Sequence, residues 1–172
     1  METTARGWNV LERENAILWR EYTFGGGVAT TFVFRGAGDG LIGRFEPLEA
    51  LAPLLGERAT AIDPPGHKVG NAIATVRGSH GSYWYSSDLF ANIPKLPSNI
   101  VLRLLMSITH KAPGYRLFRP AVWLQVKDKK LVRDWIDDVM TKAAPTTVVP
   151  AHGPPITGTD VPEKTKALAA EI

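Results

Sequence analysis

The chain has 172 residues, a formal net charge of +3 at pH 7 and no cysteine. This length fits a single domain, and a hydrophobic content of 44% is enough to form a core. Without cysteine, the chain cannot form disulfides, thiolate zinc knuckles or iron–sulfur centres, nor use a cysteine nucleophile. Any metal site must therefore use Asp, Glu or the four histidines.

Charge and hydropathy predict a cytoplasmic protein with no nucleic-acid or membrane partner. The 20 basic residues nearly balance the 17 acidic ones and are spread along the chain, whereas a phosphate-binding surface is usually clustered. The longest apolar stretch, around residues 100–108, contains Arg103 and is too short to cross a bilayer. The first residues lack the apolar core of a signal peptide.

The first third of the chain predicts strands over residues 8–12, 16–24 and 28–35. The third is rich in β-branched and aromatic residues, which favour strands. In the second, Ile17 and Trp19 alternate onto one face. The glycine-rich residues 36–40 follow a strand, but no helix opens after them, so we do not expect a nucleotide-binding loop.

The middle of the chain mixes helices and strands. In chain order we expect a short helix, three strands and a longer segment containing a helix, at residues 47–55, 59–63, 72–77, 82–86 and 96–110. Residues 78–81 are typical of a hairpin turn, and His80 within them is expected to be a solvated turn residue. The last segment has apolar residues at helical spacing, namely Ile100, Leu104, Leu105 and Ile108.

The last third predicts a strand or extended loop over 121–126, a helix over 129–142, a strand over 146–149 and a helix over 162–172. Asp128 is placed to cap the helix that follows it. That helix carries a core-facing stripe of Leu131, Val132, Trp135, Ile136 and Val139. Core positions are also expected for the tryptophans Trp84, Trp123 and Trp135.

Three potential metal ligands lie on predicted loops at the ends of strands. His67 sits in a proline–glycine turn, Asp88 follows an aromatic strand, and His152 follows an apolar strand. A layered sheet can bring such loops together at one edge, where sites are commonly built. Imidazole and carboxylate ligands suit zinc, iron or manganese. Taken alone, each residue also fits an ordinary loop position.

The order and context of these segments resemble the metallo-β-lactamase fold superfamily. The resemblance rests on PGH-x-x-G at 65–70, SSDLF at 86–90 and PAHG at 150–153, and it covers most of the chain. It implies an α+β (α/β) fold in which mixed and antiparallel sheets pack face to face between helices, an αβ/βα sandwich. We expect one such domain over residues 1–172, in an incomplete form.

The resemblance also implies chemistry. His67 would be a metal ligand, Asp88 would bridge two metals, and His152 would be a further ligand. A metal-bound hydroxide, oriented by Asp88 as the catalytic residue, would attack an ester, thioester, lactone or phosphoester of a small-molecule substrate. The expected metal is zinc, or iron or manganese, in a site that lacks some of the family's ligands.

The family's most specific motif, H-x-H-x-D-H, cannot exist in this chain. The histidines are His67, His80, His110 and His152, and no two are separated by a single residue. The stretch between Arg35 and His67 is too short for the elements that should lie there, so we place the missing segment near residues 41–46. The alternative to a hydrolase is therefore a catalytically inactive pseudo-enzyme or binding module of the same fold.

A shortened sandwich should leave an apolar face uncovered. We therefore expect the chain either to form a homodimer over that face or to be only marginally stable.

Overall fold

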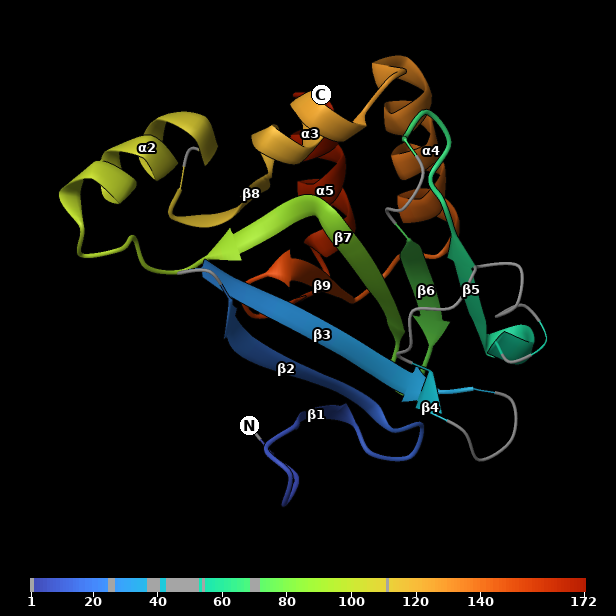
Figure 1. Ribbon diagram of the computed structural model, residues 1–172. Coiled ribbons are helices and arrows are strands. Elements are labelled where there is room, and N and C mark those ends of the chain that lie inside the picture. The colour runs from blue at the N-terminus through green and yellow to red at the C-terminus, as the bar shows by residue number, and fades with distance from the viewer. Residues whose placement is uncertain are drawn as a thin grey trace.

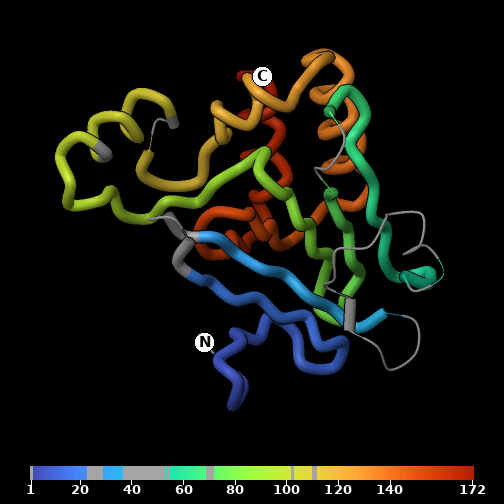
Figure 2. The backbone as a smooth tube through the Cα atoms, viewed as in Figure 1, coloured from blue at the N-terminus to red at the C-terminus, as the bar shows by residue number. Residues whose placement is uncertain are grey.

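The computed structural model describes residues 2–24, 27–36, 41–42, 53, 55–68, 72–110 and 112–172. These residues form an α+β fold with one antiparallel and one mixed sheet, and helices against the second sheet (Figures 1 and 2). Within the described ranges, no helix is both long and apolar enough to cross a membrane.

The first sheet is antiparallel and follows the chain order. Its strands are β1 (Asn9–Glu12), β2 (Ile17–Phe24), β3 (Gly27–Arg35) and β4 (Leu41–Ile42). The three strands predicted in the first third are confirmed. Ile17 and Trp19 are both buried, and Trp19 pairs with Phe32 across β2 and β3, so the predicted apolar face of this strand is also confirmed. Nearly all of the predicted 47–55 helix and of the proposed missing segment lies outside the described residues.

The second sheet has the order β10-β9-β7-β6-β5, with β8 also paired to β7. Its strands are β5 (Ala59–Ile62), β6 (Ile73–Arg77), β7 (Ser82–Ile93), β8 (Gly114–Leu117), β9 (Thr147–His152) and β10 (Ile156–Thr157). β7 and β9 run parallel, and the other pairs are antiparallel. The predicted hairpin is confirmed by the bond from the amide of Gly78 to the carbonyl of Gly81, 2.8 Å long.

Strand β7 is longer than predicted, and it bends at Ser87. Ser87 has a φ of +49°, and the register with β9 shifts on both sides of it, as in a β-bulge. The bend is visible in Figure 1. Asp88 therefore lies within β7 rather than past its end, because the strand resumes after the bulge. His152 is likewise the last residue of β9 rather than a residue of the following loop.

Four α-helices and one 3₁₀ turn complete the described fold. They are η1 (Gly56–Arg58), α2 (Ile100–His110), α3 (Arg119–Gln125), α4 (Lys129–Lys142) and α5 (Val161–Ala169). The prediction of a strand or loop over 121–126 is wrong for residues 121–125, because Pro120 lies in the first turn of a helix and Ala121 and Val122 bury one side of it. For α4, the amide of Leu131 donates to Asp128 Oδ1 at 2.9 Å, which confirms the predicted cap.

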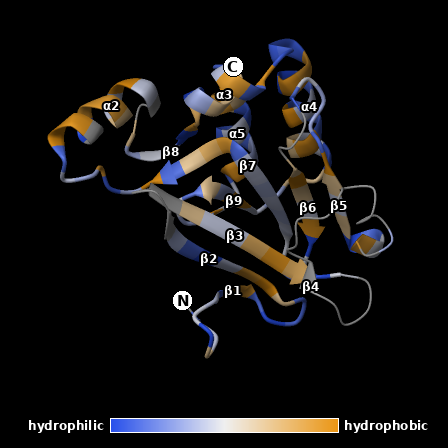
Figure 3. Ribbon diagram, in the orientation of Figure 1, coloured by the Kyte–Doolittle hydropathy of each residue, from blue (hydrophilic) through white to orange (hydrophobic). Residues whose placement is uncertain are grey.

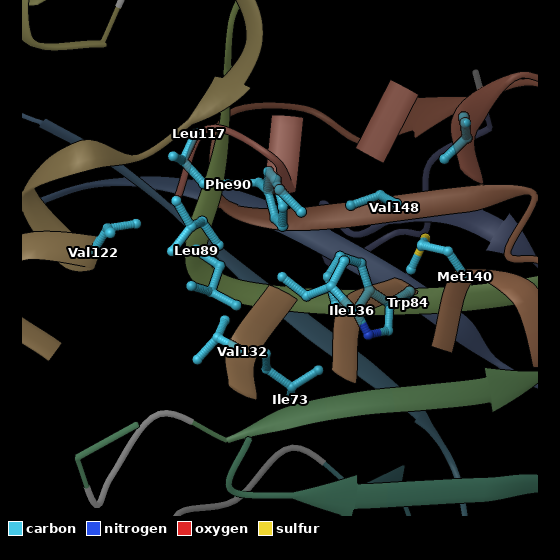
Figure 4. Close-up of a cluster of buried hydrophobic side chains, with 13 residues drawn as sticks. Ile73, Trp84, Leu89, Phe90, Leu117, Val122, Val132, Ile136, Met140 and Val148 are labelled. Carbon is cyan, nitrogen blue, oxygen red and sulfur yellow. The ribbon is translucent and has the colours of Figure 1, made fainter. Parts of the chain in front are cut away.

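One core lies between the second sheet and the helices (Figure 4). Trp84 and Phe90 of β7 pack in it with Val132 and Ile136 of α4, which are buried as the sequence predicts. Leu131 departs from the predicted stripe, since 45% of its surface is exposed.

A second core lies between the two sheets. It joins apolar side chains of the first sheet to those of the second: Ile17, Trp19, Phe32 and Phe34, with Ala59, Ala74, Val76, Tyr83 and Val149. The order of layers is therefore sheet, sheet, helices, with apolar packing between each pair of layers. This burial is the main favourable contribution to folding.

Glu12 is a buried carboxylate that joins β1 to the β6–β7 hairpin. It accepts hydrogen bonds from the side chain of Asn15, the amides of Ser79 (2.9 Å) and His80 (3.2 Å), and the Tyr83 hydroxyl (3.2 Å). Burial acts to raise the pKa of Glu12, but these hydrogen bonds together outweigh it and lower the pKa. Burial and the neighbouring Glu12 carboxylate raise the pKa of Tyr83 to about 12. The side chain of His80 is exposed, as predicted.

We predict that Glu12→Gln lowers the free energy of unfolding by about 2 kcal/mol at pH 7, because it removes the buried negative charge that accepts these hydrogen bonds. The folded pKa is below the ordinary value of 4.5, so the contribution of this charge is present above that pH. It is lost as the pH falls through the folded pKa. Urea unfolding at pH 7 and pH 3 should therefore show a difference from wild type that shrinks in acid.

Glu57→Gln is the matched control, since Glu57 is exposed in η1 and should change little at either pH. Equal stability of wild type and Glu12→Gln at pH 7 would contradict the role assigned to Glu12.

Candidate functional site

Two of the three predicted ligands meet in the structure. The Oδ1 atom of Asp88 lies 3.2 Å from the Nε2 atom of His152, and about a third of each side chain is exposed. They meet because β7 and β9 are parallel neighbours and Asp88 directly follows the bulge in β7. The pair is thus reachable from solvent and held by the two central strands of the second sheet.

Helix α3 supports this pair at both of its ends. Phe118, which precedes the helix, packs its ring against the His152 imidazole with centroids 4.8 Å apart. Gln125, the last residue of the helix, donates a side-chain hydrogen bond to Asp88. Sequence analysis missed both residues. Neither lies in a motif, and only the packing of α3 beside β7 and β9 brings them to the site.

The electrostatics keep Asp88 ionised. The hydrogen bond from His152 is the largest influence and lowers the pKa of Asp88, the partial burial of the carboxyl opposes it, and Gln125 lowers the pKa further. Nearby, burial and the Asp88 charge raise the pKa of Tyr85 to about 12, so this phenol stays protonated. The site therefore contains a carboxylate in contact with an imidazole.

His67 lies on the turn that is tied to the α3–α4 junction. The amide of Asp128 donates to the Gly66 carbonyl at 3.1 Å, and the amide of Lys68 donates to the Gln125 carbonyl at 2.8 Å. Gly66 has a φ of +80°, and a Cβ there would lie 2.7 Å from the Asp128 carbonyl oxygen. Only glycine fits this position without strain. The PGH turn is therefore held firmly against the end of α3.

His67 does not join Asp88 and His152 in a three-ligand group. Burial lowers the pKa of His67 and Asp63 partly offsets this, which favours a neutral imidazole. Across the part of the chain that the structure describes, no three His, Asp or Glu side chains are arranged to hold a metal ion. Two ligands of the predicted set are thus together, and the third lies on a neighbouring turn.

Two buried side-chain oxygens, one near Asp88 in sequence and one on its partner Gln125, have no hydrogen-bond partner among the described residues. They are Ser86 Oγ, two residues before Asp88, and Oε1 of Gln125. An unsatisfied buried polar atom costs about 1–3 kcal/mol, and such an oxygen can accept a hydrogen bond from water or coordinate a hard cation. Gln125 donates to Asp88 through its side-chain NH2 group, so the unsatisfied amide oxygen is not the atom that faces the carboxylate.

A separate depression of about 600 Å³ lies between α4 and α5. It is lined by Lys130, Arg133, Asp134, Asp137, Lys166, Ala169 and Ala170. The lining mixes both signs of charge and includes none of the predicted site residues, so it offers no focused binding chemistry.

Compared with known proteins, the chain matches no protein-family model, no curated protein and no solved structure. The resemblance to the metallo-β-lactamase fold superfamily thus rests on the three motifs. The contact between Asp88 and His152 is the structural observation that bears most directly on the site.

We predict that His152→Ala raises the pKa of Asp88 toward its ordinary value of 3.8, because the largest influence lowering it is removed. Carboxyl ¹³C chemical shifts followed through an acid titration measure this change directly. His80→Ala, at an exposed turn, should leave the Asp88 titration unchanged. An unaltered Asp88 titration in His152→Ala would mean that the two side chains are not in contact.

A second prediction concerns Gly153, which follows His152. Gly153 and Gly114 both have left-handed φ values, +93° and +98°, but a Cβ at Gly153 would collide with the carbonyl oxygen of Asn92. At Gly114 it would meet nothing within 4 Å. Gly114→Ala should therefore lower the free energy of unfolding by about 1 kcal/mol, and Gly153→Ala by about 3 kcal/mol or more.

Thermal and urea unfolding of the two variants provide the comparison. If both variants lose a similar amount of unfolding free energy, the close contact between Gly153 and the Asn92 carbonyl is not important for stability.

Proposed function

We propose that this chain is a hydrolase-like protein with a metallo-β-lactamase-type αβ/βα sandwich, which binds one divalent metal ion through Asp88 and His152. The observation that carries the proposal is the 3.2 Å contact between these side chains, which come from two separate motifs of the resemblance. The face-to-face packing of two sheets supports the sandwich, although the described helices lie beyond the second sheet rather than beyond both sheets.

The Asp88 carboxylate and the His152 imidazole are ligand types that suit zinc, iron or manganese, and they would fill two positions of the coordination sphere. When bound, such a metal would supply a Lewis acid for hydrolysis of an ester, thioester, lactone or phosphoester of a small-molecule substrate. Asp88 remains a carboxylate, and Phe118 and Gln125 limit how the two ligands can rotate. We propose a cytoplasmic location and no nucleic-acid partner.

One observation favours the alternative, a catalytically inactive binding module of the same fold. Asp88 and His152 bond to each other, and Gln125 donates to Asp88 as well, so the carboxylate and the imidazole already have protein partners. The lack of an H-x-H-x-D-H motif points in the same direction.

Equilibrium dialysis against Zn²⁺, Fe²⁺ and Mn²⁺, followed by elemental analysis, tests metal binding. We expect about one metal ion per chain in the wild type, and a loss of affinity of about tenfold or more in Asp88→Asn and in His152→Ala. His80→Ala is the control and should bind like wild type. His67→Ala should keep most of the affinity, because His67 does not join Asp88 and His152 in a three-ligand group.

The same samples, loaded with metal, should be assayed with a nitrophenyl ester and a nitrophenyl phosphodiester. Turnover that is lost in Asp88→Asn supports the hydrolase, whereas metal binding without turnover supports the binding module. Less than about 0.1 metal ion per wild-type chain would contradict the metal site itself.

A further inference from the structure

Helix α2 presents its apolar side chains to solvent rather than to the core. Ile100, Leu104 and Ile108, spaced four residues apart on one stripe, are 77%, 62% and 69% exposed. Val101 and Leu105 flank them and are also exposed. The predicted helix is confirmed, but its apolar face does not pack against either sheet. In Figure 3 this helix is mostly hydrophobic in colour and lies at the edge of the molecule.

Helix α3 extends this apolar face. Its Trp123 and Leu124 are 63% and 68% exposed, so the prediction that Trp123 is a core residue is wrong. The two helices contact each other, and they supply seven of the ten exposed large hydrophobic side chains among the described residues. We call these seven side chains, five from α2 and two from α3, the α2–α3 surface.

The stretch of chain that forms this surface carries only positive charge, and one of its cations, Arg119, is paired with Glu171 of the C-terminal segment. No Asp or Glu occurs between Asp88 and Asp128. Four basic side chains in this stretch are exposed: Lys95 before α2, Arg103 within it, Arg116 between the helices and Lys127 after α3. A wide apolar face with a tryptophan and a basic rim is the composition of a helix that lies in the interface of an anionic membrane.

We propose that the α2–α3 surface binds the surface of a bilayer that contains anionic phospholipids. The sequence predicts no membrane partner because no segment is long enough to span, but binding at the interface needs only one apolar face. The basic rim would lie among the lipid headgroups while the apolar side chains enter the acyl boundary. The proposal needs no metal ion and is independent of the proposed hydrolase function.

The charge pattern favours a membrane over a second copy of the chain. In a twofold dimer the same surface faces itself, so basic side chains would approach basic side chains. Shape favours the membrane over a partner helix, which binds in a groove. Helix α2 instead projects from the edge of the fold, and its main contact is with α3 (Figures 1 and 2).

Co-sedimentation with vesicles tests the proposal. Vesicles of phosphatidylcholine with about 30% phosphatidylglycerol should bind the wild type about tenfold more strongly than pure phosphatidylcholine vesicles, and added salt should weaken this binding. The double variant Leu104→Ser/Ile108→Ser should reduce binding by about tenfold or more. Arg103→Glu should remove much of the preference for anionic lipid.

Tyr22→Ser is the matched control, because Tyr22 is an exposed large side chain on β2 and does not belong to the α2–α3 surface. It should bind vesicles like wild type. Since the substituted α2 side chains are exposed, circular dichroism should show all variants folded.

Two results would overturn the proposal. One is that the wild type does not bind vesicles at all, or that it binds both kinds of vesicle equally and the double variant binds them just as well. The other is a wild-type dimer in sedimentation equilibrium that the double variant converts to a monomer, which would assign the surface to a second copy of the chain.

Discussion

The bend of β7 at Ser87 is the constraint on which the rest of the structure depends. The first half of the strand pairs with β6, the second half pairs with β8, and β9 pairs with residues on both sides of the bend. A left-handed residue that is not glycine costs about 1–2 kcal/mol, and here the packing on both faces of β7 offsets it. Trp84 and Phe90 enter the helix-side core, and Tyr83 enters the core between the sheets. The same bend sets Asp88 beside His152.

Polar contacts fix the alignment of layers that apolar burial holds together. At one end of the sheets, the Glu12 carboxylate is satisfied by donors from the β6–β7 hairpin. At the other end, Thr30 of β3 donates to the Gly153 carbonyl at 3.0 Å, and Asn92 of β7 donates to Pro154 at 2.9 Å. Apolar packing alone allows neighbouring layers to slide, whereas these directional bonds define how the layers align.

Local sequence patterns predicted much of the secondary structure. They failed where tertiary contacts determined the conformation of a segment. Most strands and helix α4 follow from alternation, β-branched residues and the Asp128 cap. Residues 121–125 were misassigned because valine and tryptophan favour strands, while Pro120 and burial against the sheet impose a helix. Of the site, the motifs identified Asp88 and His152. Phe118 and Gln125 carry no sequence signal, since their role depends on where α3 packs.

By itself, the sequence determined that cysteine chemistry is excluded, that the H-x-H-x-D-H motif is missing, and that positive charge alone occupies the stretch between Asp88 and Asp128. These are properties of composition and spacing, which folding does not alter. Only the tertiary structure decided that Asp88 meets His152 while His67 stays on its own turn, and that the apolar stripe of α2 faces solvent. Both outcomes depend on which distant segments pack together, and periodicity along the chain does not specify the partner of an apolar or polar face.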